Sequence, residues 1–151
     1  MSIGIDELFE MISWNSDEET QRRGIELAKD ITCLSVFLMP HGGKYSKDIW
    51  ENCAKIICSY PDEILIYYLT ELLEWIEDIN WPGAEIVFER LCGFSNTEWL
   101  TREISDSVKI ALVQKRNIWL NNILALYSEN KKLENRLPED IFRMLLAFNL
   151  N

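Results

Sequence analysis

Apolar residues recur three and four positions apart along most of the chain, which is the spacing of one face of an α-helix. The first such stripe consists of Ile5, Leu8, Phe9 and Ile12, with acidic residues on the opposite side. No useful length of sequence alternates between apolar and polar residues, as a half-buried strand would. The pattern therefore predicts an all-α protein.

The clearest boundary between two helices is the segment Trp-Ile-Glu-Asp-Ile-Asn-Trp-Pro-Gly at residues 75–83. Proline disfavours helical geometry in the residue before it and suits the first turn of the next helix. We therefore predict one helix over residues 61–80, a tight turn, and a second helix over residues 82–92. The turn motif comprises Trp75, Asp78, Asn80, Trp81, Pro82 and Gly83. We expect its two polar side chains to hydrogen-bond the turn backbone, and Trp81 to pack between the two helices.

Capping residues mark further helices. Predicted starts are Ser16 with Glu19, for a helix through about Thr32; Ser46; Asn96 or Thr97, with Trp99 facing inward; and Pro138. Near residues 114–117 the pattern turns polar, which indicates a break or a bend, and we favour a break. Gly24, inside the second helix, suggests close approach of a neighbouring helix, and a helix that simply tolerates the glycine is the alternative.

The predicted helices form short-linked neighbours at an interval near the roughly 40 residues of HEAT-type units. The expected fold is an α-α superhelix, a HEAT/armadillo-like array of about eight antiparallel helices, and residues 1–151 form a single helical-repeat domain.

The charge balance narrows the class of partner. The chain has 25 acidic and 15 basic residues, for a formal net charge of -10. Such a surface repels nucleic acid and anionic membranes, whereas it steers a basic protein toward the chain. No apolar stretch reaches the roughly 18 residues of a membrane span.

The four cysteines lie within apolar helical patterns and lack the C-x-x-C spacing of a metal site. We interpret them as small core residues and expect no metal and no cofactor. The first residues show no basic region followed by an apolar run, so the expected compartment is the cytoplasm.

Four segments carry a resemblance to a known family: Trp-Asn-Ser-Asp-Glu-Glu at 14–19, Gly-Ile-Glu-Leu-Ala at 24–28, Trp-Glu-Asn-Cys-Ala-Lys at 50–55, and residues 72–84 around the turn. The chain resembles an uncharacterised bacterial family of small HEAT-like helical proteins, whose hallmark is a Trp-x-x-Asp-x-Asn-Trp-Pro-Gly turn. The resemblance covers roughly residues 5 to 95, and the C-terminal third lies outside it. It implies an α-α superhelix and no catalytic residues.

One acidic row stands out as a candidate binding surface. Its members recur at about one helical turn on the outer side of the predicted helix 61–80: Glu63, Tyr67, Glu71, Glu74 and Asp78. Such a row is usually a solvated helix face. With Tyr67 as an anchor, it would also suit a basic protein or peptide.

Three hypotheses of function follow. The leading one is a non-catalytic protein-interaction module, the second is an immunity or antitoxin-like protein that neutralises a basic toxin, and the third is a cryptic enzyme. A solvated loop position is the simpler interpretation of His41, the single histidine. A pocket that gathered His41 with carboxylates would favour the enzyme. We expect most of the six tryptophans to lie in the core. The sequence does not define an oligomeric state.

Overall fold

The computed structural model describes residues 3–41 and 46–150. Within those ranges the regular elements are helices and no strand is present, which confirms the predicted all-α fold. The α-helices are α1 (Ile5–Ile12), α2 (Glu18–Leu27), α3 (Lys47–Ile57), α4 (Asp62–Leu65), α5 (Leu69–Trp75), α6 (Ala84–Cys92), α7 (Thr97–Val113), α8 (Asn117–Glu129) and α9 (Glu139–Leu150). The 3-10 helices are η1 (Ala28–Asp30), η2 (Leu34–Phe37), η3 (Ile66–Tyr68) and η4 (Lys131–Leu133).

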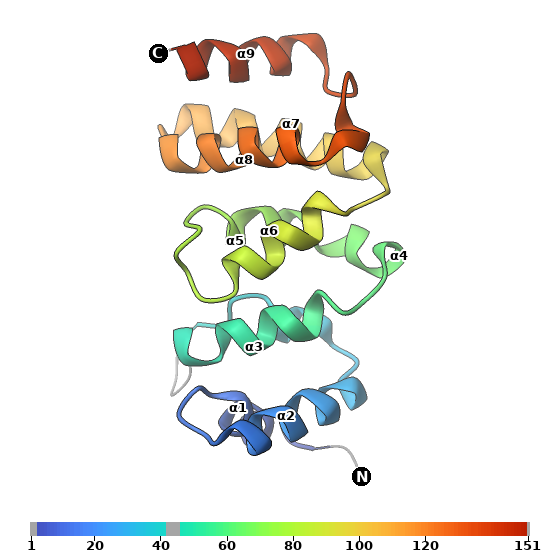
Figure 1. Ribbon diagram of the computed structural model, residues 1–151, viewed down its shortest axis with the longest axis vertical. Helices are drawn as coiled ribbons and strands as arrows, with labels where there is room; N and C mark the ends of the chain where they lie inside the picture. Colours follow the sequence, from blue (N-terminus) through green and yellow to red (C-terminus); the bar gives the residue numbers. More distant parts are fainter. Residues whose placement is uncertain (1–2, 42–45, 151) are drawn as a thin grey trace.

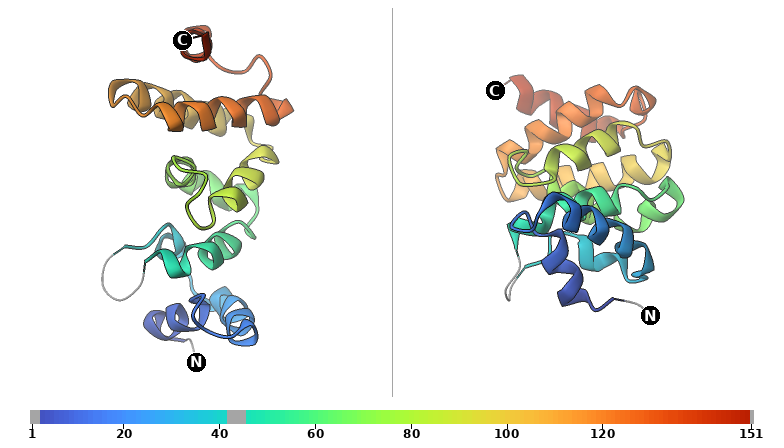
Figure 2. Two further views of the ribbon diagram at one scale, coloured as in Figure 1. Left: turned by 60° about the vertical axis from the view of Figure 1, so that its left-hand side comes forward. Right: turned by 60° about the horizontal axis from the view of Figure 1, so that its bottom comes forward.

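The helices are stacked in layers along the long axis of the molecule (Figure 1). From the N-terminal end the layers hold α1 with α2, η2 with α3, α5 with α6, and α7 with α8, and α9 packs on the last of these. The same order is visible from the two other directions in Figure 2. The chain is therefore an α-α superhelix, as the helical periodicity predicts.

Buried apolar side chains hold the layers together. They form one cluster that runs from Leu8 in α1 to Leu145 in α9. Removal of this apolar surface from water is the main favourable term in folding. The first layer also confirms the close approach expected at Gly24, because a Cβ atom there would lie 2.7 Å from the Ile12 side chain.

Side chains from one layer cap the helix ends of the layer before it. The last carbonyl groups of an α-helix have no partner within that helix, and they cost free energy if they are buried without a donor. The donors and their acceptors are Asn52 to Ile12 O (2.7 Å), Arg90 to Cys58 O (3.2 Å) and Tyr60 O (3.0 Å), Asn122 to Ile76 O (2.7 Å), and Asn130 to Leu91 O (2.9 Å) and Phe94 O (3.0 Å). These contacts link successive layers through hydrogen bonds as well as through the core.

Several predicted helix ends are wrong in the N-terminal half. Asp17, rather than Ser16, caps α2, because its carboxylate accepts a hydrogen bond from the Thr20 N–H at 2.8 Å. This bond lowers the pKa of Asp17. The helix ends at Leu27 and continues only as η1, since Ile31 is already extended. Ser46 precedes α3 as predicted, but its side chain makes no capping hydrogen bond.

The single helix predicted over residues 61–80 is also wrong. The structure has α4, then η3, then α5, because Tyr68 leaves the helical region with φ -125° and ψ 12°. Helix α5 ends at Trp75, and α6 begins at Ala84 rather than at Pro82.

In the C-terminal half, the expected break is confirmed: α7 ends at Val113 and α8 begins at Asn117. Asn96 caps α7 by accepting a hydrogen bond from the Trp99 N–H at 3.3 Å. Across the described residues, no helix has the length and apolar character that crossing a bilayer requires.

Exposed side chains correct two expectations about the core. Trp99, which was expected to face inward, is 40% exposed, and Trp14 is one of the tryptophans outside the core, at 57% exposed. Cys33 is also exposed, whereas Cys53 is buried. Burial raises the pKa of the Cys53 thiol and raises that of Cys58 to about 12, which keeps both thiols neutral.

Candidate functional site

A surface hollow of about 410 Å³ lies where α3 approaches α5 and the turn that follows it. We call it the Trp81 hollow. Its lining residues come from the segment before α3, from α3 itself, from the C-terminal end of α5 and from the turn: Met39, His41, Ser46, Lys47, Trp50, Glu74, Glu77 and Trp81. The N-terminal end of α3 and the turn after α5 both lie on the left side of the molecule in Figure 1.

The turn motif positions Trp81 above α3. Trp75 is fully buried and donates its indole N–H to Pro82 O at 3.0 Å, which fixes the turn against α5. The Asp78 carboxylate accepts a hydrogen bond from the Asn80 backbone N–H at 2.9 Å, which is the role expected for Asp78. Asn80 takes part through its backbone rather than through its side chain. Gly83 adopts a left-handed conformation, with φ 85°.

Glycine is required at position 83 for space as well as for conformation. A Cβ atom there would lie 2.7 Å from Ala54 Cβ and 2.8 Å from the carbonyl oxygen of Trp50. The turn can therefore approach α3 closely only because this residue has no side chain. Trp81 is half-buried and its ring contacts Trp50 of α3, a contact that the predicted packing between the two helices of the turn did not include. The fully buried tryptophan beside the turn is Trp75.

Aromatic rings form the apolar part of the Trp81 hollow. Trp81 and Trp50 meet edge to face, with ring centroids 5.9 Å apart and an interplanar angle of 79°. The His41 ring meets Trp50 in the same manner at 5.2 Å. Trp50 is only 3% exposed and donates its indole N–H to Pro40 O at 2.9 Å, so it forms the floor of the hollow. Trp81 is half-buried and leaves part of its ring open.

Carboxylates form the polar part. Glu74 and Glu77 line the hollow from α5 and the turn, and Glu77 forms an ion pair with Arg116. The pKa of Glu74 is raised by partial burial and then by the neighbouring charges of Glu71 and Glu77, against which Arg116 acts in the opposite direction. Glu71 has one buried carboxylate oxygen with no hydrogen-bond partner in the described part of the chain. Of these three carboxylates, Glu77 is the one that forms an ion pair with Arg116.

The structure does not bring the predicted acidic row together as one helix face. Glu63 lies on α4 and is exposed, Tyr67 lies on η3 and is 75% exposed, and Glu71 and Glu74 lie on α5. Asp78 lies in the turn, where its carboxylate is engaged by the Asn80 backbone. Of these five residues, Glu74 alone lines the Trp81 hollow.

Sequence reasoning missed Lys47, Trp50 and Glu77 as lining residues. Lys47 and Trp50 share one face of a helix that the sequence predicts. The spacing of residues along that helix does not show which other element packs against this face. His41 was expected to be a solvated loop residue; it is exposed, yet its ring contacts Trp50 and it lines a hollow with two carboxylates.

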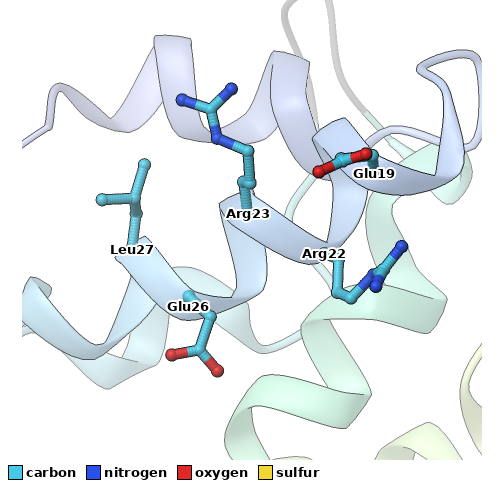
Figure 3. A pocket seen from close by; sticks show the side chains of 5 residues that line it. All are labelled: Glu19, Arg22, Arg23, Glu26 and Leu27. Carbon is cyan, nitrogen blue, oxygen red and sulfur yellow. The ribbon is translucent and has the colours of Figure 1, made fainter.

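A second hollow lies along α2, as Figure 3 shows. It measures about 330 Å³, and its lining residues are Glu19, Arg22, Arg23, Glu26 and Leu27. These side chains all come from one helix and point in different directions, with charges of both signs. Two glutamates and two arginines balance in charge, so this hollow favours neither a cation nor an anion. The Trp81 hollow combines aromatic rings with carboxylates and is the better candidate for a binding site.

No three His, Cys, Asp or Glu side chains among residues 3–41 and 46–150 lie close enough together to hold a metal ion. In the same ranges, no hydrogen bond joins His41 to either carboxylate of the hollow. The arrangement offers an aromatic surface beside negative charge, which suits the binding of a cation.

Comparison with known proteins gives one match. The model of a family described as a domain of unknown function (DUF5071) matches residues 47–146. The match begins at α3, ends within α9 and includes Lys47, Trp50, Glu74, Glu77 and Trp81. The match covers most of the C-terminal third, which the sequence resemblance left out, and it does not include residues 5–46, which the resemblance covered. It agrees with the resemblance in pointing to a family without an assigned function. Neither the curated proteins nor the solved structures contain a match to the chain.

Proposed function

The chain belongs to the family of the domain of unknown function DUF5071, and from this premise we propose that it is a non-catalytic module that binds a basic protein or peptide. We interpret its stacked layers as a small HEAT-like scaffold. Arrays of this kind present long continuous surfaces to their partners. The proposed docking surface follows the chain through α4, η3 and α5, where Glu63, Tyr67, Glu71 and Glu74 lie on three successive elements.

The observation that carries this proposal is the surplus of carboxylates on α5 and its flanks. Neither Glu71 nor Glu74 forms an ion pair with a cation of the described residues, and their neighbour Glu77 takes Arg116. A basic partner would offset the repulsion among the negative charges of Glu71, Glu74 and Glu77. The net charge of -10 would also raise the rate at which such a partner arrives.

Tyr67 supports the same surface. Its side chain is 75% exposed, and the ring ends in a hydroxyl group, a combination that is common at binding anchors. All four cysteines are free, with Cys53 buried and Cys33 exposed, which is consistent with a reducing compartment, and we propose that the interaction takes place in the cytoplasm.

The first alternative is an immunity-like protein that uses the same acidic surface to mask a basic toxin. Small size and acidity favour it. An enzyme is the second alternative, favoured by the placement of His41 in a hollow with Glu74 and Glu77. His41→Ala tests the last hypothesis, because an enzyme that uses this imidazole as its acid or base would lose turnover.

The test is affinity capture from the native cytoplasm with wild-type protein and with Glu63→Lys/Glu74→Lys as the matched control. We use Glu63 and Glu74, which are exposed, because reversal at Glu71 would place a charged amine at a partly buried position. A basic protein retained by wild type and lost by the control supports the proposal. Many peptides indicate a scaffold, and one saturating enzyme indicates an immunity protein. Equal recovery on both proteins refutes the acidic surface.

A further inference from the structure

Among residues 3–41 and 46–150, three arginines each lie over an aromatic ring and pair with a carboxylate, and one of these carboxylates, Glu77, also lines the Trp81 hollow. The three sets are Arg90 over Phe94 with Asp62, Arg102 over Trp99 with Glu98, and Arg116 over Trp119 with Glu77. The guanidinium carbons lie 5.7, 4.9 and 5.9 Å from the respective ring centroids. Planar guanidinium groups favour both contacts at once.

The Trp81 hollow holds the same ring and carboxylate without the arginine. Trp81 leaves part of its ring open, and Glu74 lies on the same hollow without an ion pair among the described residues. The neighbouring Arg116 is engaged by Glu77. We propose that the Trp81 hollow binds the guanidinium group of an arginine side chain supplied by the partner, stacked on Trp81 and paired with Glu74. This inference rests on the proposed function and names the group that is recognised.

The size of the hollow fits this ligand. Its volume of about 410 Å³ is many times the roughly 30 Å³ that one water molecule occupies, so a guanidinium group enters together with part of its stem. A third hollow, which Trp81 also lines, includes Glu51 and Glu85, so further carboxylates lie near this tryptophan. An anion would meet charge of its own sign in both hollows.

One cation of the chain already lies at the edge of the site. The Lys47 ammonium is 6.0 Å from the centroid of the Trp50 ring. The Lys47 side chain is exposed, so an entering guanidinium group can displace its ammonium group from the ring. The positive charges of the ammonium and the guanidinium groups repel each other. Lys47→Ala should therefore tighten arginine binding, a direction opposite to that expected if Lys47 helped to hold an anion.

The test titrates N-acetyl-arginine N-methylamide into the protein and follows the indole N–H signals of the six tryptophans by ¹⁵N NMR. The Trp81 signal, assigned from Trp81→Leu, should shift and saturate. The neutral citrulline analogue should leave it in place. Glu74→Gln should weaken binding about three- to tenfold, whereas Glu7→Gln, which removes the same charge from an exposed position on α1, should leave it unchanged.

Three results would overturn the inference: no saturable shift of Trp81, the same shift with citrulline, or equal binding by wild type and Glu74→Gln. If Trp81→Leu does not fold, Glu74→Gln still decides the question, and Trp99→Leu provides a tryptophan control outside the hollow. The titration uses the protein alone, so it is separate from the capture experiment. Probe binding without any captured protein would support the hollow and refute the protein partner.

Discussion

Asn130 provides the sharpest test of how the layers are held together. It lies directly after α8, is 1% exposed, and makes three hydrogen bonds through its side chain. It donates to Leu91 O at 2.9 Å and to Phe94 O at 3.0 Å, and it accepts from the Lys132 N–H at 3.1 Å. Asn130→Ala removes all three while leaving a backbone conformation that alanine accepts, with φ -86° and ψ 94°.

The three bonds differ in what their loss costs. Leu91 O keeps a backbone donor, the Phe94 N–H at 3.1 Å, whereas Phe94 O loses the donor that the Asn130 side chain supplied. A buried carbonyl without a donor costs about 1–3 kcal/mol, and an ordinary hydrogen bond contributes about 1 kcal/mol. The Lys132 N–H can donate its hydrogen bond to water instead. We therefore expect Asn130→Ala to lower the free energy of unfolding by about 2–4 kcal/mol.

Urea unfolding followed by circular dichroism measures this loss as a lower midpoint with an unchanged slope. Asn121→Ala is the matched control, because Asn121 is exposed on α8, and its substitution should change stability by less than about 0.5 kcal/mol. A loss below about 1 kcal/mol at Asn130 would refute the argument that the side chain caps buried carbonyls.

Three further predictions follow from the turn and its carboxylates. Trp75→Ala should cost about 3–5 kcal/mol of unfolding free energy because Trp75 is fully buried, while Trp81→Ala should cost clearly less; equal losses in urea unfolding would contradict the assigned packing. Gly83→Ala should cost about 2 kcal/mol or more, because the new Cβ would meet α3 at a positive φ, and a calorimetric melting temperature equal to wild type would contradict this. Folding raises the pKa of Glu74, so the folded protein binds the carboxyl proton more tightly than the unfolded chain does. Ionisation of Glu74 therefore lowers the stability of the folded protein as the pH rises. Glu74→Gln should therefore raise the melting temperature at pH 7, with a gain that disappears below the ordinary titration range of a carboxyl group; a constant gain at every pH would contradict this sign.

The layered fold could be predicted because each helix has an apolar stripe that reports its own buried side. The break between α7 and α8, the cap at Asn96 and the close approach at Gly24 are local features, and the sequence shows each of them. The interruption of the helix at Tyr68 could not be predicted, because the apolar stripe continues through η3 without a proline or glycine.

The candidate site could be predicted only in part. Glu74 follows from the acidic row, but Trp50 and His41 reach the hollow through contacts between segments that are distant in sequence. The capping contacts between layers are hidden for the same reason, since Asn52 and Asn130 resemble ordinary polar helix residues until their partners are known. The contact of Trp81 with Trp50 is of the same kind, and Trp75, six positions earlier, is the fully buried tryptophan beside the turn.

The central claim is that a basic partner docks on the surface that includes Glu63 and Glu74. It is tested most directly by the association rate of the captured partner, measured by stopped flow at low and high salt. The account predicts that Glu63→Lys/Glu74→Lys slows association and flattens its salt dependence. Glu7→Lys/Glu10→Lys, which changes the net charge equally through exposed residues of α1, should have a much smaller effect. Equal rates for wild type and Glu63→Lys/Glu74→Lys at both salt concentrations would contradict the claim.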